Sequence, residues 1–357
     1  MRVLMVTQAV DIDHPTLGFT VGWVNALARR VDHVHVVTMK GGRADLTTNV
    51  TLHAYGPSSE TPSRWQRWRF YNRQFSSLIL GSKVDVVLVH MIPRWVLIAA
   101  PYVCLRGVPI LIWFVHRQVT LESKIAHHVV RQVLTASPGS YRVRLDKVTV
   151  LGHGIDTELF SPAPHVHPDP HKVIAVGRVS PIKDLETLLH AADVLVNQRG
   201  QTGWRFCIVG GPNPGMVDYY DELKDMAYHL NLVHQVSFTG TISYQDMPDL
   251  YRRTGVLVNL TGRGSVDKVV LESLACGTAV VVCNRTFEPL LGSQGERFFF
   301  REGNAVDLAR RLEGVASLSG RERARLAQLF RENVISCHGL DNLMSQLVGV
   351  LEASTLS

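Results

Sequence analysis

Cysteine is scarce and scattered in this sequence. The five cysteines are odd in number and lie mostly in apolar stretches: Cys104, Cys207, Cys276, Cys283 and Cys337. Neither a zinc cage nor a disulfide framework fits such spacing, so we expect core thiols and no bound metal.

Long apolar runs are also missing. The sequence contains no run of about 18 uncharged apolar residues, which predicts no membrane-spanning helix. Its first residues, MRVLMVTQAV, are typical of a strand and too short for a signal peptide. With 46% hydrophobic and 19% charged residues, we expect a soluble cytoplasmic protein.

Positive charge is concentrated in the first half of the chain. Residues 1–165 hold 18 Lys and Arg against 10 Asp and Glu, a balance of +8, whereas the remainder holds 19 against 21, a balance of −2. Such a field suits an anionic membrane surface, a phosphate-bearing substrate or nucleic acid.

Short β-branched runs alternate with amphipathic helical stretches throughout, which is the pattern of parallel sheets covered by crossover helices. The strand candidates are residues 2–7, 33–39, 50–55, 85–91, 109–116, 132–137, 147–152, 172–179, 205–211, 236–240, 256–261 and 279–283. This alternation predicts an α/β protein with two Rossmann-like domains, which would face each other across a cleft.

A linker is predicted between the two series of strands. Residues 161–172 contain four prolines and three histidines, which cannot sustain a helix or a central strand. We therefore expect a first domain over 1–160, a second over 173–335, and a C-terminal helix over 336–357 that could pack back on the first domain.

Two loops of the second domain could hold an anion. Arg178 directly follows a strand and Lys183 comes five residues later, just before a predicted helix near Asp184. A guanidinium fork and a mobile ammonium beside a helix N-terminus match two neighbouring phosphates, although a solvated loop is the alternative. Gly210 and Gly211 also follow a strand, where they would permit close backbone approach or simply make a tight turn.

The segment from Thr261 to Val281 contains a lysine at the start of an apolar helix, where a positive charge is unfavourable. Its apolar helix begins with Asp267, whose carboxylate we expect to cap the exposed N–H groups, and with Lys268, which faces the positive end of the helix dipole. Lys268, Glu272 and Cys276 share one face. A bound diphosphate would explain the lysine better than a surface ion pair, which is the alternative.

The ordered set of motifs resembles one enzyme family over essentially the whole chain. These motifs are VGRVSPIKDLETLL, VGGP, VSFTG, DLYRRTGVLVNLT and VVLESLACGTAVVV in the second half, and TLGFTVGWVNALA, LIWFVHRQV and VLGHGIDTELFSP in the first. In this order they are similar to the family 4 retaining glycosyltransferases (glycosyl transferases group 1), enzymes of the GT-B fold. The resemblance implies that the first domain binds the acceptor and the second the nucleotide-sugar donor.

The resemblance also implies roles for individual residues. Arg178 and Lys183 would hold the donor diphosphate and, with His116 beside the transferred sugar, form the catalytic set. For His116, which ends an apolar strand, a purely structural role is the alternative. Glu272 would bind the ribose hydroxyls, and Gly18 would let a loop of the first domain approach the phosphates. The remaining donor-binding candidates are Gly211, Thr241, Ile242, Ser265, Val266, Asp267, Lys268 and Val269.

One position departs from the family pattern. Glu272 is the second glutamate of the E-x7-E signature, but the first falls on Gly264, so the carboxylate that usually contacts the sugar is absent. Either Asp267 or Lys268 assumes part of its role, or the donor sugar sits differently. The amides of Ser265, Val266 and Asp267 could still serve the sugar or phosphate.

The reaction implied is transfer of a hexose or N-acetylhexosamine from a UDP- or GDP-sugar to a hydroxyl of a glycan or lipid-linked acceptor, with retained configuration. The resemblance implies no metal, and no cofactor beyond the nucleotide diphosphate sugar as co-substrate. A non-catalytic sugar-nucleotide sensor and a GT-B sugar-nucleotide epimerase are the alternatives.

A basic, aromatic segment lies in the first domain. Arg64 to Phe75 carries four arginines, with Trp68, Tyr71, Phe75 and Leu78 on one helical face. Such a helix could bind an anionic membrane surface and hold the enzyme on the inner face of the membrane. The alternative is an ordinary amphipathic helix packed on the first sheet. The sequence lacks any recognised nucleic-acid-binding module, so we expect no nucleic-acid partner.

Overall fold

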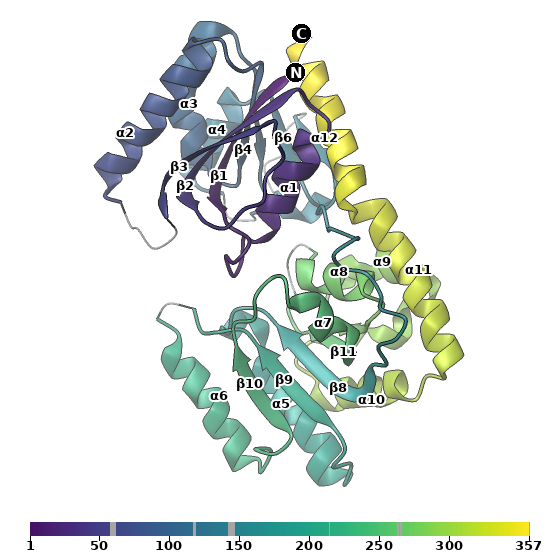
Figure 1. Cartoon of the computed structure of the whole chain (residues 1–357). Helices are drawn as coiled ribbons and strands as arrows, with labels where there is room; N and C mark the ends of the chain where they lie inside the picture. Colours follow the sequence, from purple (N-terminus) through teal and green to yellow (C-terminus); the bar gives the residue numbers. More distant parts are fainter. Residues whose placement is uncertain are drawn as a thin grey trace. The chain divides into compact units, whose positions relative to one another are not determined.

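The chain forms two compact units (Figure 1). The computed structural model describes residues 1–57, 62–116, 119–141, 147–213, 215–262, 264 and 266–356. The first unit comprises Met1–Asp156 together with Cys337–Ser357, and the second comprises Thr157–Ser336. Each is an α/β unit built on a parallel sheet, which confirms the predicted pair of Rossmann-like domains.

A seven-stranded sheet forms the first unit, in the order β3-β2-β1-β4-β5-β6-β7, and every neighbouring pair is parallel. Its strands are β1 (Arg2–Val10), β2 (His33–Gly41), β3 (Val50–Pro57), β4 (Val86–His90), β5 (Ile110–Trp113), β6 (Gln132–Thr135) and β7 (Val148–Val150). Nearly continuous apolar runs such as VVLVH suit a sheet that is buried on both faces.

Helices cover both faces of this sheet. They are α1 (Phe19–Ala28), α2 (Arg64–Phe75), α3 (Pro93–Arg106), α4 (Leu121–Val129) and α12 (Leu340–Thr355). Alternate residues of β1 point to opposite faces, so Val3 and Met5 join one apolar core whereas Leu4 and Val6 join the other. The first core is closed by α1 and α12, and the second by α2, α3 and α4.

The last helix of the chain is an integral part of the first unit. Leu343, Leu347 and Leu351 of α12 are buried in the same core as Val3 and Trp23. The backbone leading into α12 pairs with the end of the first segment, since Ile155 N–H donates to His338 O and Leu340 N–H donates to Ile155 O, at 2.7 and 2.8 Å.

The second unit contains a five-stranded parallel sheet in the order β10-β9-β8-β11-β12. Its strands are β8 (Asp169–Val176), β9 (Arg205–Val209), β10 (Val236–Gly240), β11 (Thr254–Asn259) and β12 (Ala279–Val282). Its helices are α5 (Leu185–Asp193), α6 (Val217–His229), α7 (Met247–Arg252), α8 (Lys268–Ala275), α9 (Glu288–Leu291), α10 (Ala305–Ala316) and α11 (Gly320–His338).

The structure divides the chain differently from the predicted linker. The second unit begins at Thr157, and β8 already begins at Asp169, within the range 161–172. Arginines fix the start of this segment: Arg252 Nε donates to Ser161 O at 2.7 Å and Arg331 donates to Phe160 O at 2.8 Å. The proline-rich segment is therefore irregular in backbone, and its start is held to the second unit by arginine hydrogen bonds.

Shorter helical turns complete the described fold. They are the π-helical segments Ser76–Leu80 and Val194–Gln198, and the 3₁₀ turns Pro138–Ser140, Pro181–Lys183, Arg285–Phe287 and Gly292–Phe298. Within the described ranges, every helix falls short of the length and apolar character that a membrane span needs.

Candidate functional site

Most of the candidate residues lie at one edge of the second sheet. Parallel strands bring their carboxyl ends to the same edge, so the loops that follow them are neighbours. Arg178 and Lys183 follow β8, Gly211 follows β9, Thr241 and Ile242 follow β10, and Val266, Asp267, Lys268, Val269 and Glu272 follow β11, the last three within α8.

Backbone hydrogen bonds join the loops that follow β8, β9 and β10. Val179 N–H donates to Gly211 O at 2.9 Å, and Gly210 N–H donates to Gly240 O at 2.8 Å. Gly210 has a φ of 136°, and a Cβ atom there would lie 2.0 Å from Gly177 O. Only glycine permits this conformation and approach, so the diglycine has a structural reason in addition to any ligand.

Lys183 lies against the start of α8. Its Nζ donates to Asp267 Oδ2 at 2.9 Å, and Asn259 Nδ2 donates to the same oxygen at 2.8 Å. These residues come from three places in the sequence: the turn before α5, the end of β11 and the N-terminus of α8. The carboxylate is thus shared between a lysine and an amide.

The expected capping role of Asp267 is wrong. Asp267 occupies the N-cap position of α8, but among the described residues its side chain makes no capping hydrogen bond, because it is turned toward Lys183 and Asn259. The first turn of α8 is therefore left without a side-chain cap, and its N–H groups are suited to an anion.

Lys268 and Glu272 form a desolvated pair on α8. Glu272 is buried, and its Oε2 accepts a hydrogen bond from the hydroxyl of buried Tyr251 at 3.1 Å. Burial raises the pKa of Glu272, and the charge of Lys268 opposes this shift. Burial lowers the pKa of Lys268, opposed by the charge of Glu272. Both charged forms are thus disfavoured by desolvation and supported by each other.

Arg178 is exposed, and in the described part of the chain no hydrogen bond or ion pair engages its side chain. Ser265 lies outside the described residues. At the position of the missing glutamate, Gly264 has a φ of 146°, which strains any residue with a side chain. The backbone at position 264 therefore favours glycine over the glutamate of the family pattern.

Two polar residues at and just after the end of β11 were not among the sequence candidates. Asn259 Oδ1 and Thr261 Oγ1 are buried and have no hydrogen-bond partner among the described residues. Asn259 also lines a small cavity of about 10 Å³ together with Gly177 and Lys183, which is room for about one water molecule. The signal was present in VLVNLT, where polar residues end an apolar strand.

Gly18 and His116 belong to the first unit. Gly18 occupies the position before α1, which follows β1, and His116 is exposed three residues after β5. The ring of His116 lies 6.0 Å from that of Phe114. Both residues therefore follow strands of one parallel sheet, at the edge where ligands of such sheets bind.

Metal ligands are not clustered in the described ranges: no group of three or more His, Cys, Asp or Glu side chains is arranged to hold an ion.

The second unit matches a known family. Residues 157–332 match the model of "Glycosyl transferases group 1". The chain is 29% identical over 181 residues to D-inositol 3-phosphate glycosyltransferase of Rhodococcus jostii, an alignment that covers 49% of this chain and 40% of that protein. A second such enzyme, from Thermobispora bispora, is 28% identical over 154 residues, which cover 40% of this chain and 36% of that protein. The match thus spans two fifths or less of these two relatives' length.

The whole chain matches solved structures in fold. Anabaena HepE, solved in complex with UDP and glucose, has a TM-score of 0.75 and 16% identity, with 99% of this chain and 100% of that chain covered. Sucrose-phosphate synthase from Thermosynechococcus elongatus has the same TM-score and identity over 99% and 98% of the two chains. The protein therefore has the GT-B fold, and its residues 157–332 match the glycosyl transferases group 1 model.

Proposed function

We propose that this protein is a retaining glycosyltransferase that moves a hexose or N-acetylhexosamine from a UDP- or GDP-sugar to a hydroxyl of a glycan or lipid-linked acceptor. The observation that carries the proposal is the contact of Lys183 with the N-cap of α8 inside a glycosyl transferases group 1 domain. A lysine and an uncapped helix N-terminus together provide a site for a diphosphate.

The diphosphate is the group that gains charge during such a transfer. Lys183 would exchange its contact with Asp267 for a phosphate oxygen, and Arg178, already exposed, would add a two-pronged donor. A diphosphate beside Lys268 would also raise the lowered pKa of that lysine and favour its charged form. With the donor bound, these charges would stabilise the leaving group where its charge develops.

The remaining roles concern the nucleotide and the sugar. One carboxylate oxygen of Glu272 accepts a hydrogen bond from Tyr251, and the carboxylate can still accept from ribose hydroxyls. The loops at Gly211, Thr241 and Ile242 would contact the base, and Gly18 and His116 keep the roles that the resemblance implies for them. We nominate no pair of carboxylates among the described residues as flanking the transferred bond, and we therefore propose front-face attack assisted by the leaving phosphate and independent of metal.

A panel of sugar nucleotides tests this proposal. We expect UDP, GDP or one of their sugar conjugates to raise the melting temperature, since a ligand at 100 times its Kd stabilises by about 2.7 kcal/mol. Product analysis with the selected donor should then show sugar transfer with retained configuration, undiminished by EDTA. If none of these nucleotides shifts the melting temperature, the donor assignment is wrong.

A non-catalytic sugar-nucleotide sensor is the second candidate, and Gly264 is the observation that favours it. A sensor would bind the same nucleotide and catalyse neither transfer nor hydrolysis of the donor. Prolonged incubation with radiolabelled donor and a mixture of acceptors separates the two, because slow hydrolysis alone already requires a catalytic site.

Contact with an anionic membrane surface through Arg64 to Phe75 is a further part of the proposal. Trp65 and Trp68 are exposed and their rings stack at 4.7 Å, which suits insertion at a lipid interface. Tyr71 and Phe75, in contrast, pack in the core, so only part of the predicted aromatic face is exposed. Flotation with vesicles containing phosphatidylglycerol tests this contact, and Trp65→Ala/Trp68→Ala should reduce it.

A further inference from the structure

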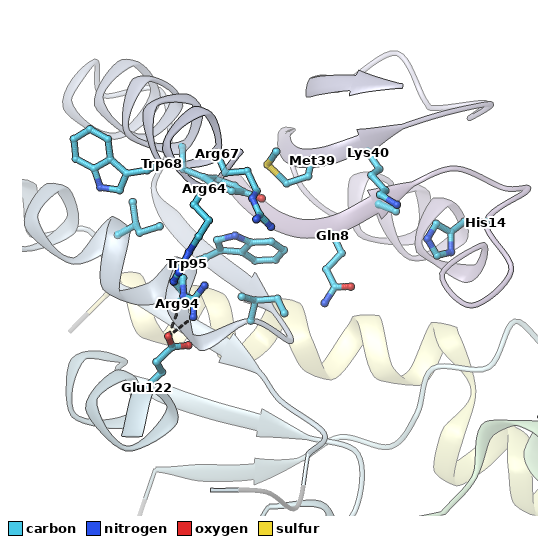
Figure 2. A pocket seen from close by; sticks show the side chains of 14 residues that line it. Gln8, His14, Met39, Lys40, Arg64, Arg67, Trp68, Arg94, Trp95 and Glu122 are labelled. Atoms are coloured by element: carbon cyan, nitrogen blue, oxygen red, sulfur yellow. Dashed lines mark hydrogen bonds and ion pairs between the residues drawn. The ribbon is translucent and has the colours of Figure 1, made fainter. Parts of the chain in front are cut away.

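The first unit contains a cavity of about 580 Å³ that the proposed donor site does not use (Figure 2). Its wall is formed by the ends of β1 and β2, one face of α2 and the start of α3. A volume of this size is typical of a site for a small organic molecule.

Positive charge dominates the wall of this cavity. Lys40, Arg64, Arg67 and Arg94 line it against a single carboxylate, that of Glu122. Arg94 Nε donates to Glu122 Oε1 at 2.9 Å, so this pair is largely neutralised. The side chains of the other three cations make no hydrogen bond or ion pair with any described residue, and Figure 2 shows Arg64 and Arg67 close to Trp95.

The spacing of α2 places its cations on two different faces. Arg64, Arg67, Trp68 and Tyr71 follow the i, i+3, i+4, i+7 pattern and line the cavity. Arg69 and Arg73 lie on the opposite side of the helix and are outside this wall. The helix therefore provides its own matched control, since two arginines face the cavity and two do not.

One aromatic residue of the cavity wall, Tyr71, has a buried hydroxyl without a described partner. Tyr71 is 2% exposed, and its hydroxyl oxygen has no hydrogen-bond partner among the described residues. A buried hydroxyl left unpaired costs free energy, so a ligand oxygen that accepts from it would gain a contact that the protein does not supply. Trp95, Met39 and Ile98 add apolar surface beside it.

We propose, resting on the glycosyltransferase function above, that this cavity binds the acceptor through a phosphate or diphosphate group attached to an apolar carbon skeleton. Arg64 and Arg67 hold the phosphate oxygens, Tyr71 donates its hydroxyl, and the carbon skeleton lies on Trp95 and Ile98. Two unpaired guanidinium groups near an aromatic wall fit such an amphiphilic anion better than they fit a neutral sugar.

Calorimetric titration with three probes tests the proposal. The probes are geranyl diphosphate as a short lipid phosphate, D-inositol 3-phosphate as a soluble one, and geraniol as the uncharged skeleton. We expect geranyl diphosphate to bind most tightly and geraniol to bind weakest. Tighter binding of D-inositol 3-phosphate than of geranyl diphosphate would overturn the apolar skeleton and leave only a phosphate site.

Variants then locate the binding site. Arg64→Gln/Arg67→Gln should weaken binding of the phosphate probes by about 100-fold, because charge-assisted hydrogen bonds are lost, and Tyr71→Phe by about 3- to 10-fold. The matched variant Arg69→Gln/Arg73→Gln, with the same loss of charge on the same helix, should leave binding within about twofold. Equal losses in the two double variants, or no binding of either phosphate probe, would overturn the proposal.

One further variant separates this cavity from the donor site, which could also bind a diphosphate. Lys183→Ala should keep its affinity for geranyl diphosphate, and binding lost with Lys183→Ala but kept in Arg64→Gln/Arg67→Gln would contradict the cavity site. If sugar nucleotides fail to bind while geranyl diphosphate binding still depends on Arg64 and Arg67, the donor assignment fails and the cavity site stands.

Discussion

The two units contain two charged sites that differ in how their charges are balanced. In the second unit, Lys183 is paired with Asp267, and Lys268 and Glu272 support each other within α8. In the first unit, Lys40, Arg64 and Arg67 face a cavity without a described ionic partner. A ligand must therefore displace an existing pair in the second unit, whereas it supplies a missing charge in the first.

This difference teaches that the second site is preorganised by the protein itself. Lys183 and Lys268 are held near carboxylates before any ligand arrives, so little of their side-chain entropy is lost on binding. The cations of the first site lack such partners among the described residues. We expect affinity there to depend more strongly on the charge of the ligand and on ionic strength.

The largest effect is expected at Lys183. Lys183→Ala should lower turnover by about 10²–10³-fold, the loss seen when one donor to a developing negative charge is removed. Steady-state kinetics with the selected donor will measure it, with Lys224→Ala as the control because Lys224 is an exposed lysine paired with Asp221. Near-normal turnover of Lys183→Ala would exclude this lysine from the phosphate site.

The desolvated pair on α8 should reduce stability near neutral pH. Folding raises the pKa of Glu272 from 4.5 to about 7, which costs stability as the pH rises through that range. Folding lowers the pKa of Lys268 from 10.5 to about 8, which costs stability as the pH falls through that range. The loss of folding stability caused by the pair is therefore greatest between about pH 7 and about pH 8.

Replacing both members of this pair should thus stabilise the unliganded protein. Lys268→Met/Glu272→Gln is expected to add about 1–4 kcal/mol near neutral pH, as for other buried pairs replaced by neutral groups. Urea unfolding followed from about pH 5 to about pH 9 should show the gain shrinking toward both ends. The single variant Glu272→Gln, which leaves the lysine without its carboxylate, should instead lose stability.

A smaller effect is expected at Asp267, where a substitution should strengthen the binding of pyrophosphate. Asp267→Asn removes the carboxylate that holds Lys183, so inorganic pyrophosphate no longer has to displace it and should bind about 3- to 10-fold more tightly. Calorimetry measures this gain. Weaker donor binding in the same variant would instead assign the Asp267 carboxylate to the transferred sugar, in place of the glutamate missing at Gly264.

The smallest effect is expected in the first unit. Arg64 and Arg67 are exposed and without described ionic partners, so Arg64→Gln/Arg67→Gln should change the free energy of unfolding by less than about 0.5 kcal/mol. Urea unfolding checks this value. A large loss of stability would show that these arginines hold the fold together and would remove the contrast between the two sites.

Sequence periodicity was enough to predict both sheets. Runs such as VVLVH and AVVVC are apolar, β-branched and bounded by turns, so strand positions could be read with little ambiguity. Every strand candidate of both halves corresponds to a strand of the structure. The linker was harder, because proline content reports irregular backbone but cannot reveal that Arg252 and Arg331 anchor it.

The candidate site was predictable only in part, for a physical reason. The sequence places Lys183 and Asp267 after different strands of one sheet. Whether the Asp267 carboxylate caps α8 or accepts a hydrogen bond from Lys183 depends on how close the two loops come in the folded protein. The same limit applies to the cavity of the first unit. Lys40, Arg94 and Tyr71 lie on separate elements, and no local sequence pattern indicates that they line the same cavity.

The position of α12 has a consequence for how the protein is made. The first sheet is synthesised early, yet Leu343, Leu347 and Leu351 of α12 complete its core. While the second unit is still being translated, the first core lacks the apolar side chains that α12 contributes. The core of the first unit is therefore finished only after α12 has been translated, about 180 residues after the rest of that unit.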